Sequence, residues 1–236
     1  QVQAHELLSA GLNFTFDSHD TALLNASAGA HGTHLSTSLK DLQKLGIDAV
    51  TVAAGVGEIS VSLGADSLGA LSSTDMPVFG DTNADGTLSL AEDNALKVTL
   101  DVADLSQMGQ VSALDNHVLS DAGIDAVRLD LIGSNFDLTS ASEWTNLENA
   151  LTAVRADSLD AIVGIDLNQA ADLIGAGFVH TFAAADTITL DASVGGHGTH
   201  LSTSLKDLQK LGVDAVSFDH DVKSIQVDGT DAHLLS

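Results

Sequence analysis

Apolar positions along this chain keep a helical spacing for two turns and then change to the alternation of a β-strand. In the clearest example, Leu39, Leu42 and Leu45 fall on one face of a helix. Gly46 follows, where a left-handed glycine closes a helix, and alternating apolar residues begin at Val50. This pattern predicts a helix, a glycine cap and a strand in direct succession.

Polar residues mark where this helix begins. Ser38 and Asp41 have the spacing of a capping box, with Asp in place of the usual Glu, so the helix is expected to start at Ser38. The same helix–glycine–strand theme recurs along the chain. Glycines close its other copies at four places, strongly at Gly123 and Gly212 and more weakly at Gly11 and Gly177.

Further elements follow from the same periodicities. Helices are expected near residues 111–122 and 142–155. Additional strands are expected at residues 13–16, 59–63, 97–102, 161–165, 187–191 and 224–227. Helices that alternate with strands imply crossover connections and largely parallel pairing, so we expect an α/β fold of repeating helix–Gly–strand units. The periodicity leaves open whether these units wind as a solenoid or fold as compact lobes.

The chain also repeats itself over a long distance. Residues 31–46 and 197–212 read the same sixteen letters, HGTHLSTSLKDLQKLG, at an offset of 166. Weaker identity extends the match to residues 3–63 and 169–229, as expected for a recent duplication within an array. The expected organisation is a first copy at 1–64, a unique middle at 65–168 and a second copy at 169–236.

The charge of the chain narrows the classes of partner. Acidic residues number 33 against 8 basic ones, a formal net charge of −25. Nucleic acid and anionic lipid both require Lys and Arg for neutralisation, so neither is an expected partner. No run approaches the roughly 20 apolar residues of a membrane-spanning helix, and membrane insertion is not expected. The abundance of Gly, Ala, Ser, Thr and Asp, without Cys, resembles large secreted bacterial surface and adhesin-type proteins.

One segment of the middle region has the pattern of a calcium-binding loop. Residues 81–92 read DTNADGTLSLAE, with oxygen-bearing side chains at the alternating positions that wrap around a hard cation. Gly86 permits the sharp turn and Leu88 is the apolar anchor. The expected Ca²⁺ ligands are Asp81, Asn83, Asp85, Thr87, Ser89 and Glu92.

This segment resembles the loops of EF-hand and dockerin-type calcium modules. The resemblance covers about a dozen residues, and the segment before it departs from a full EF-hand. Pro77 and Gly80 make that segment a poor entering helix, so the segment is more similar to a lone extracellular calcium loop.

A second motif, HGTH at His31–His34 and His197–His200, resembles the histidine motif of subtilisin-like proteases. The D-[ST]-G and G-T-S-M-A motifs that carry the other triad members do not occur here. His-x-x-His can also hold a transition metal such as zinc, given one or two more ligands. The interpretation we favour is a structural turn that leads into the helix, since the whole neighbourhood is duplicated.

Together these patterns predict a calcium-binding, extracellular or cell-surface repeat segment with a structural or adhesive role, and not an enzyme. Its expected partners are copies of itself, assembled head to tail into a fibre, biofilm matrix or surface layer, and surface polysaccharide. One alternative is a hydrolase or metal-dependent enzyme that uses the HGTH motifs. The other is a carbohydrate-binding module, which would need an exposed aromatic platform from a chain with 3% aromatic residues and one Trp.

Overall fold

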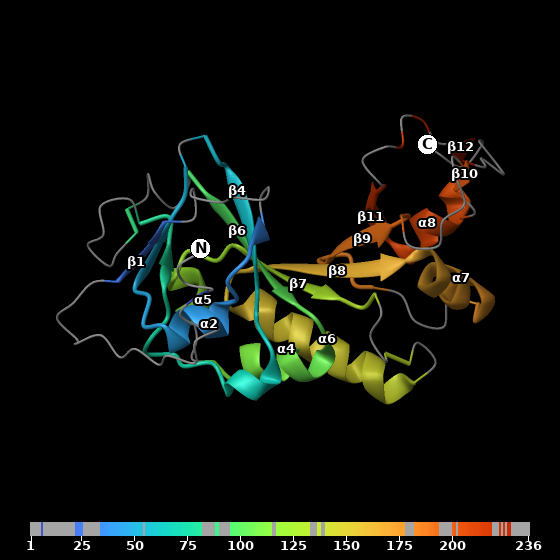
Figure 1. The fold of residues 1–236 in the computed structure, drawn as a ribbon. Coiled ribbons are helices and arrows are strands. Elements are labelled where there is room, and N and C mark those ends of the chain that lie inside the picture. Colours follow the sequence, from blue (N-terminus) through green and yellow to red (C-terminus); the bar gives the residue numbers. More distant parts are fainter. Residues whose placement is uncertain are drawn as a thin grey trace.

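The computed structural model describes most of the middle of the chain and parts of both duplicated copies (Figure 1). The described residues are 6, 22–25, 34–53, 55–81, 88–89, 95–114, 117–132, 136–137, 140–177, 182–193, 200–201, 203–218, 222, 224 and 226–227.

Three parallel sheets form the β-structure of the described chain. The largest has seven strands, in the order β2 (His34–Leu35), β4 (Glu58–Ser62), β6 (Lys97–Val102), β7 (Ala126–Asp130), β8 (Asp160–Asp166), β9 (Thr187–Asp191) and β11 (Val213–Ser217). A second sheet contains β1 (Leu23–Asn25), β3 (Ala49–Thr51) and β5 (Val78–Phe79), and a third pairs β10 (His200–Leu201) with β12 (Gln226–Val227). In every sheet the strands stand in chain order, so each lies beside the strand that precedes it there.

Helices lie between the strands along the described chain. They are α2 (Leu39–Lys44), α4 (Leu105–Val111), α5 (Val118–Asp121), α6 (Ala141–Ala156), α7 (Leu167–Gly175) and α8 (Leu205–Leu211), with a short 3₁₀ turn η1 at Asp66–Leu68. Figure 1 shows α4 and α6 lying along the same side of the central strands. The apolar residues of the strands and helices form one continuous buried core. The expected α/β fold with parallel strands is therefore confirmed.

Several expected elements are found where the periodicity placed them. Strands 97–102 and 187–191 have the expected bounds, and strands 59–63 and 161–165 differ by one residue at their ends. The helix expected at 142–155 is α6, whose apolar stripe is buried. The strand expected at 224–227 is described only as the two-residue β12, and residues 13–16 lie outside the described part of the chain.

The helix expected near residues 111–122 was wrong. Helix α4 ends at Val111, where the expected helix would begin, and only Val118–Asp121 forms a further helix, α5. Helix α4 begins at its N-cap Asp104, whose side chain accepts a hydrogen bond from the backbone N–H of Gln107 at 2.9 Å. Before α5, His117 has a left-handed backbone (φ 67°), which breaks any continuous helix at that point.

The predicted cap at Ser38 is formed, but only half of a capping box is present. The Ser38 hydroxyl oxygen accepts a hydrogen bond from the Asp41 backbone N–H at 3.2 Å. The Asp41 carboxylate accepts the Ser38 hydroxyl at 2.7 Å instead of reaching the backbone N–H of the cap residue. The Asp side chain is one carbon shorter than the usual Glu, which accounts for this shorter reach.

In most strand pairs the partner residue lies 25–29 positions further along the chain, although the offset is 34 between β7 and β8 and 39 between β4 and β6. Leu23 pairs with Ala49, and His34 pairs with Ser60, each 26 positions later. We call each such turn of chain, with its strands and helix, a coil. The coil that leads from Glu58 to its partner Lys97 is the longest between paired strands.

An aspartate joins each of three coils to the coil before it. Asp48, Asp125 and Asp214 stand at the same place in the G-[IV]-D-A-V sequence after a helix-closing glycine. Their carboxylates accept the backbone N–H at the start of the preceding strand, at 2.7 Å from Ala22, 2.6 Å from Val98 and 2.9 Å from Ile188. These three side chains, which we call the inter-coil aspartates, were not singled out by the sequence analysis, although the repeated motif contains them.

Candidate functional site

The expected calcium loop lies between β5 and β6, on the longest coil. Its entry is fixed by backbone hydrogen bonds to two neighbouring coils: Phe79 N–H donates to Ala122 O, and Gly80 N–H donates to Val50 O, both at 2.9 Å. Gly80 has a left-handed backbone (φ 83°), which only glycine adopts readily. Asp81, the expected first ligand, follows directly and is completely buried.

The other end of the loop is anchored by Leu88. A Cβ atom added to Gly123 would lie 2.6 Å from Leu88 Cδ1 and 2.8 Å from the Phe79 carbonyl oxygen. Gly123 also has φ 79°, so this glycine both closes α5 and leaves space for Leu88. Leu88 therefore packs against a neighbouring coil, as expected of an apolar anchor at loop position 8.

The structure describes two of the six expected calcium ligands. Asp81 is buried at the loop entry, and Ser89 is exposed beside the anchored Leu88. The other four expected ligands, Asn83, Asp85, Thr87 and Glu92, lie outside the described residues. Within the described part of the chain, no three His, Asp or Glu side chains converge as a metal site requires. The structure thus places Asp81 and Leu88–Ser89 of the loop, and the full ligand set stays a prediction.

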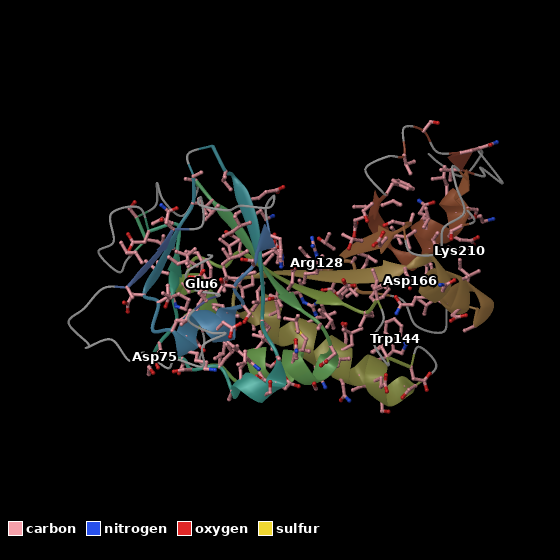
Figure 2. All side chains as sticks on the ribbon, in the orientation of Figure 1. Glu6, Asp75, Arg128, Trp144, Asp166 and Lys210 are labelled. Atoms are coloured by element: carbon pink, nitrogen blue, oxygen red, sulfur yellow. The ribbon has the colours of Figure 1, made fainter. Side chains whose placement is uncertain are left out.

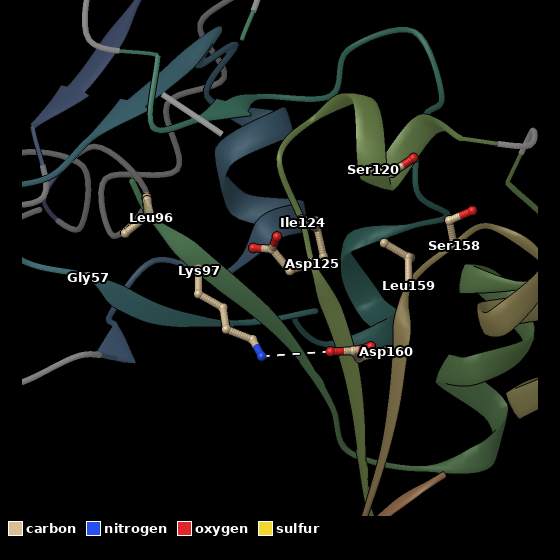
Figure 3. A pocket seen from close by; sticks show the side chains of 9 residues that line it. All are labelled: Gly57, Leu96, Lys97, Ser120, Ile124, Asp125, Ser158, Leu159 and Asp160. Atoms are coloured by element: carbon tan, nitrogen blue, oxygen red, sulfur yellow. Dashed lines mark ion pairs between the residues drawn. The ribbon is translucent and has the colours of Figure 1, made fainter. Parts of the chain in front are cut away.

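A hollow of about 510 Å³ lies at the amino ends of β6, β7 and β8 (Figure 3). Lys97 and Asp160 face each other across it, with 3.7 Å between Nζ and Oδ2, and both side chains are more than half exposed. Such an exposed pair contributes little to stability. Asp125 in the lining is engaged as an inter-coil aspartate. The hollow therefore presents hydroxyls, carboxylates and one lysine, without a nucleophile paired to a base among its described lining residues.

The side of the largest sheet opposite α4 and α6 is polar. Figure 2 shows Arg128 on this side and Trp144 on the helix side. Arg128 Nη1 lies 3.7 Å from Asp101 Oδ1. Asp130 follows on the same strand, and burial raises the pKa of its carboxyl, with the negative charges of Asp101 and Asp191 adding to the increase. Its hydrogen bond from Ile132 N–H and the charge of Arg128 act in the opposite direction.

His34, the last histidine of the first HGTH motif, lies at the edge of this polar side. Its Nδ1 atom is 2.8 Å from Ser60 Oγ and 3.8 Å from Asp101 Oδ2. A Ser-His-Asp relay uses one imidazole nitrogen for the serine and the other for the aspartate, whereas here the same nitrogen faces both. In the second copy, His200 pairs with Gln226 where His34 pairs with Ser60, so the hydroxyl is not repeated. His31 and His197 lie outside the described residues.

The one tryptophan of the chain belongs to the core. Trp144 is 8% exposed and contacts two phenylalanines, with ring centroids 5.7 Å from Phe136 and 5.1 Å from Phe182. A sugar-binding platform needs an exposed ring face, and Trp144 does not offer one.

None of the helices in the described part of the chain is long and apolar enough to cross a bilayer. Comparisons of the chain with protein-family models, with curated proteins and with solved structures found no match.

Proposed function

We propose that this chain is a calcium-binding structural or adhesive repeat segment of an extracellular protein, which associates head to tail into a fibre, matrix or surface layer. The observation that carries the proposal is the stacking of coils in chain order. A stack of this kind has two different ends and can be extended by adding coils at either of them. The acidic composition, with a net charge of −25, supports a cation-rich extracellular setting.

Calcium has a physical role in this proposal. The loop adds the carboxylates of Asp85 and Glu92 to the buried carboxylate of Asp81, and these negative charges repel one another. A bound Ca²⁺ offsets that repulsion and orders the loop. The loop entry is hydrogen-bonded to two neighbouring coils, so ordering it stiffens the stack at its longest coil. At extracellular calcium levels, a Kd of about 10⁻⁴–10⁻³ M is sufficient.

The calcium part of the proposal is tested by thermal unfolding with Ca²⁺ and with a chelator. At about 100 times the Kd, calcium raises the melting temperature by roughly 5–10 °C, since a cation bound only to the folded state adds stability. The variant Glu92→Gln, which loses the bidentate ligand, should melt at the chelator temperature in both conditions. Asp172→Asn, an equal charge change on the exposed face of α7, should keep the full calcium response. A wild-type melting temperature that ignores calcium would contradict the proposal.

The structural part is tested by sedimentation velocity and negative-stain microscopy of the purified chain over a range of concentrations. Head-to-tail association predicts growth into long species that have no fixed size. A chain that remains monomeric at every concentration, with calcium present, contradicts self-association and leaves the calcium result to stand by itself.

A further inference from the structure

The hollow at the amino ends of β6, β7 and β8 is built where the chain departs from its own repeat. Three coils carry the sequence G-[IV]-D-A-V after their helix, and the coil that leads into β8 carries S-L-D-A-I at the same place. The first residue of that sequence is Ser158, where the other three coils have a glycine. Both Ser158 and Asp160, the third residue, line the hollow.

Ser158 keeps the left-handed backbone of the glycines at the corresponding positions. Its φ is 64°, and the glycines at positions 46, 123 and 212 have φ 63°, 79° and 76°. A residue with a side chain is less stable than glycine in this conformation. The position therefore has a local cost, and in return it brings a hydroxyl to the hollow that a glycine would not. Backbone strain of this kind concentrates at functional sites.

Asp160 differs from the inter-coil aspartates in what its carboxylate meets. Asp125 exchanges two hydrogen bonds with Val98: its N–H donates to Val98 O at 2.9 Å, and its carboxylate accepts Val98 N–H at 2.6 Å. Asp160 N–H donates to Asp125 O at 2.9 Å in the same way. The returning donor would be Asp125 N–H, which is already bonded to Val98. The Asp160 carboxylate lies instead beside Lys97, with 3.7 Å between Oδ2 and Nζ.

The hollow thus has polar groups at two places, with apolar surface between them. Figure 3 shows the hydroxyls of Ser120 and Ser158 at one end and the pair of Lys97 and Asp160 at the other. Leu159 lies between these two places and is buried. The volume of about 510 Å³ is within the range of small-molecule sites.

The charges at the hollow favour a neutral ligand. An anion would have only Lys97 among the described lining residues, on a chain of net charge −25. A cation would compete with Lys97 for Asp160. A hydroxyl group is both donor and acceptor, so one hydroxyl can donate to the Asp160 carboxylate and accept from the Lys97 ammonium without separating them. A ring with several hydroxyls can also bond the two serines and pack its C–H face on Leu159.

We infer that this hollow binds a neutral sugar unit, held by hydrogen bonds to Lys97, Ser158 and Asp160. The inference rests on the adhesive part of the proposed function, to which it gives a polysaccharide as ligand. Without an aromatic platform, binding at one hollow is weak, with a Kd on the order of 10⁻³ M. In a head-to-tail array, successive hollows engage one polymer, and their combined binding is stronger than that of a single site.

NMR titration of the calcium-loaded chain tests the ligand class, with glucose, galactose, mannose and N-acetylglucosamine as probes. At least one of them should shift the backbone amide resonances of Ile124, Ser158 and Leu159 and saturate in the millimolar range. Glucuronic acid and glucosamine, the charged counterparts of two of these sugars, should bind about threefold or more weakly than their neutral forms. A panel that shifts none of these amides overturns the inference, and so does tighter binding of a charged sugar.

Two variants distinguish a ligand site from a structural role. Ser158→Gly restores the glycine of the repeat, so it should raise the melting temperature by roughly 1–3 °C while weakening sugar binding about threefold. Asp160→Ala should weaken sugar binding about tenfold and leave the melting temperature unchanged, because its ion pair is exposed. Asp172→Asn, on the exposed face of α7, is the control and should keep the wild-type affinity. Wild-type affinity in both Ser158→Gly and Asp160→Ala overturns the site.

The calcium response and self-association are measured without sugar, so their results are independent of the titration. If both are observed and no sugar binds, the sugar site is overturned and the proposed structural function is supported. If sugar binds as described and neither is observed, the site is supported and the structural function is overturned.

Discussion

The helices α2 and α8 have the same sequence and different neighbours. In both, a serine caps the helix, accepting the backbone N–H of the aspartate three residues later at 3.2 Å. Both end near a glycine with a left-handed backbone, Gly46 (φ 63°) and Gly212 (φ 76°). These features are local, so they are the same in both places. Burial differs, because it depends on the coil that lies above each helix.

The same contrast extends to the strands that follow. The pair Leu23–Ala49 on β1 and β3 has its counterpart, 166 positions on, in the pair Thr189–Ala215 on β9 and β11. The register is kept although the strands belong to different sheets of the molecule. Ala49 is buried whereas Ala215 is exposed. Pairing within a coil stack is thus a property of the repeated sequence, and the depth of burial is a property of position in the stack.

The largest expected effect is a difference in unfolding free energy between the two copies, at the leucine that is Leu39 in the first copy and Leu205 in the second. Leu39→Ala should cost about 2–5 kcal/mol of unfolding free energy, because it removes a fully buried side chain and leaves a cavity. Leu205→Ala should cost less than about 1 kcal/mol in dilute monomer, since that side chain is already partly in water. Urea denaturation monitored by circular dichroism compares the two. Equal losses would mean that the end of the stack is covered in the monomer, contrary to the described surface.

A smaller loss of stability is expected in both copies when an inter-coil aspartate is replaced. Asp48→Ala and Asp214→Ala each remove the acceptor of a backbone N–H on the preceding strand, so each should cost about 1 kcal/mol. Asp160→Ala is the matched control, because Asp160 follows the same kind of turn and its carboxylate pairs with the exposed Lys97, so its cost should be near zero. Thermal melts of the three variants give the comparison. A loss confined to Asp48 would show that these aspartates act through burial and not through the hydrogen bond.

The smallest expected effect depends on pH and lies outside both copies. Because the pKa of Asp130 is raised, its ionised form is disfavoured in the folded state and reduces stability at neutral pH. As pH falls through the raised pKa, the folded state takes up the proton first, and this cost has disappeared below the ordinary value of 3.8.

Asp130→Asn should therefore raise the melting temperature at about pH 7 by roughly 1–2 °C and leave it unchanged near pH 3. The amide oxygen can still accept the hydrogen bond from Ile132 N–H, so the turn is preserved. Melts from pH 7 to pH 3 test this, and a stabilisation that persists at the acidic end would contradict the assigned cause.

Elements were predicted well from the sequence where a capping residue and a continuous apolar periodicity were both present. Helix α6 has a capping serine at Ser140, a helical stripe that includes Trp144, and basic Arg155 in its last turn, and its bounds were predicted to within a residue. The strands with clear alternation, such as β6, were equally well predicted. Parallel pairing followed from the alternation of helices and strands.

Long-range features could not be predicted in the same way. The division of strands into separate sheets depends on where each coil turns, and alternation does not encode that. The inter-coil hydrogen bond of Asp125 links residues 27 positions apart, so no local pattern shows it. The wrong helix at residues 111–122 arose because the apolar spacing continued through a turn that left-handed His117 breaks. For the calcium loop, Asp81 and Leu88 occupy the expected frame, and the ligand set stays a prediction.

The commonest spacing, about 26 residues per coil, has a mechanical consequence. Neighbouring strands in a sheet lie about 4.8 Å apart, so one folded coil adds only that length to the stack. The same 26 residues pulled straight span on the order of 80 Å. When the chain is pulled along its stacking direction, single coils should unfold from the end one at a time, so the chain lengthens in steps. Each step dissipates mechanical work before the force acts on the next coil. The inter-coil aspartates, one to each of three coils, stand where such a step would begin.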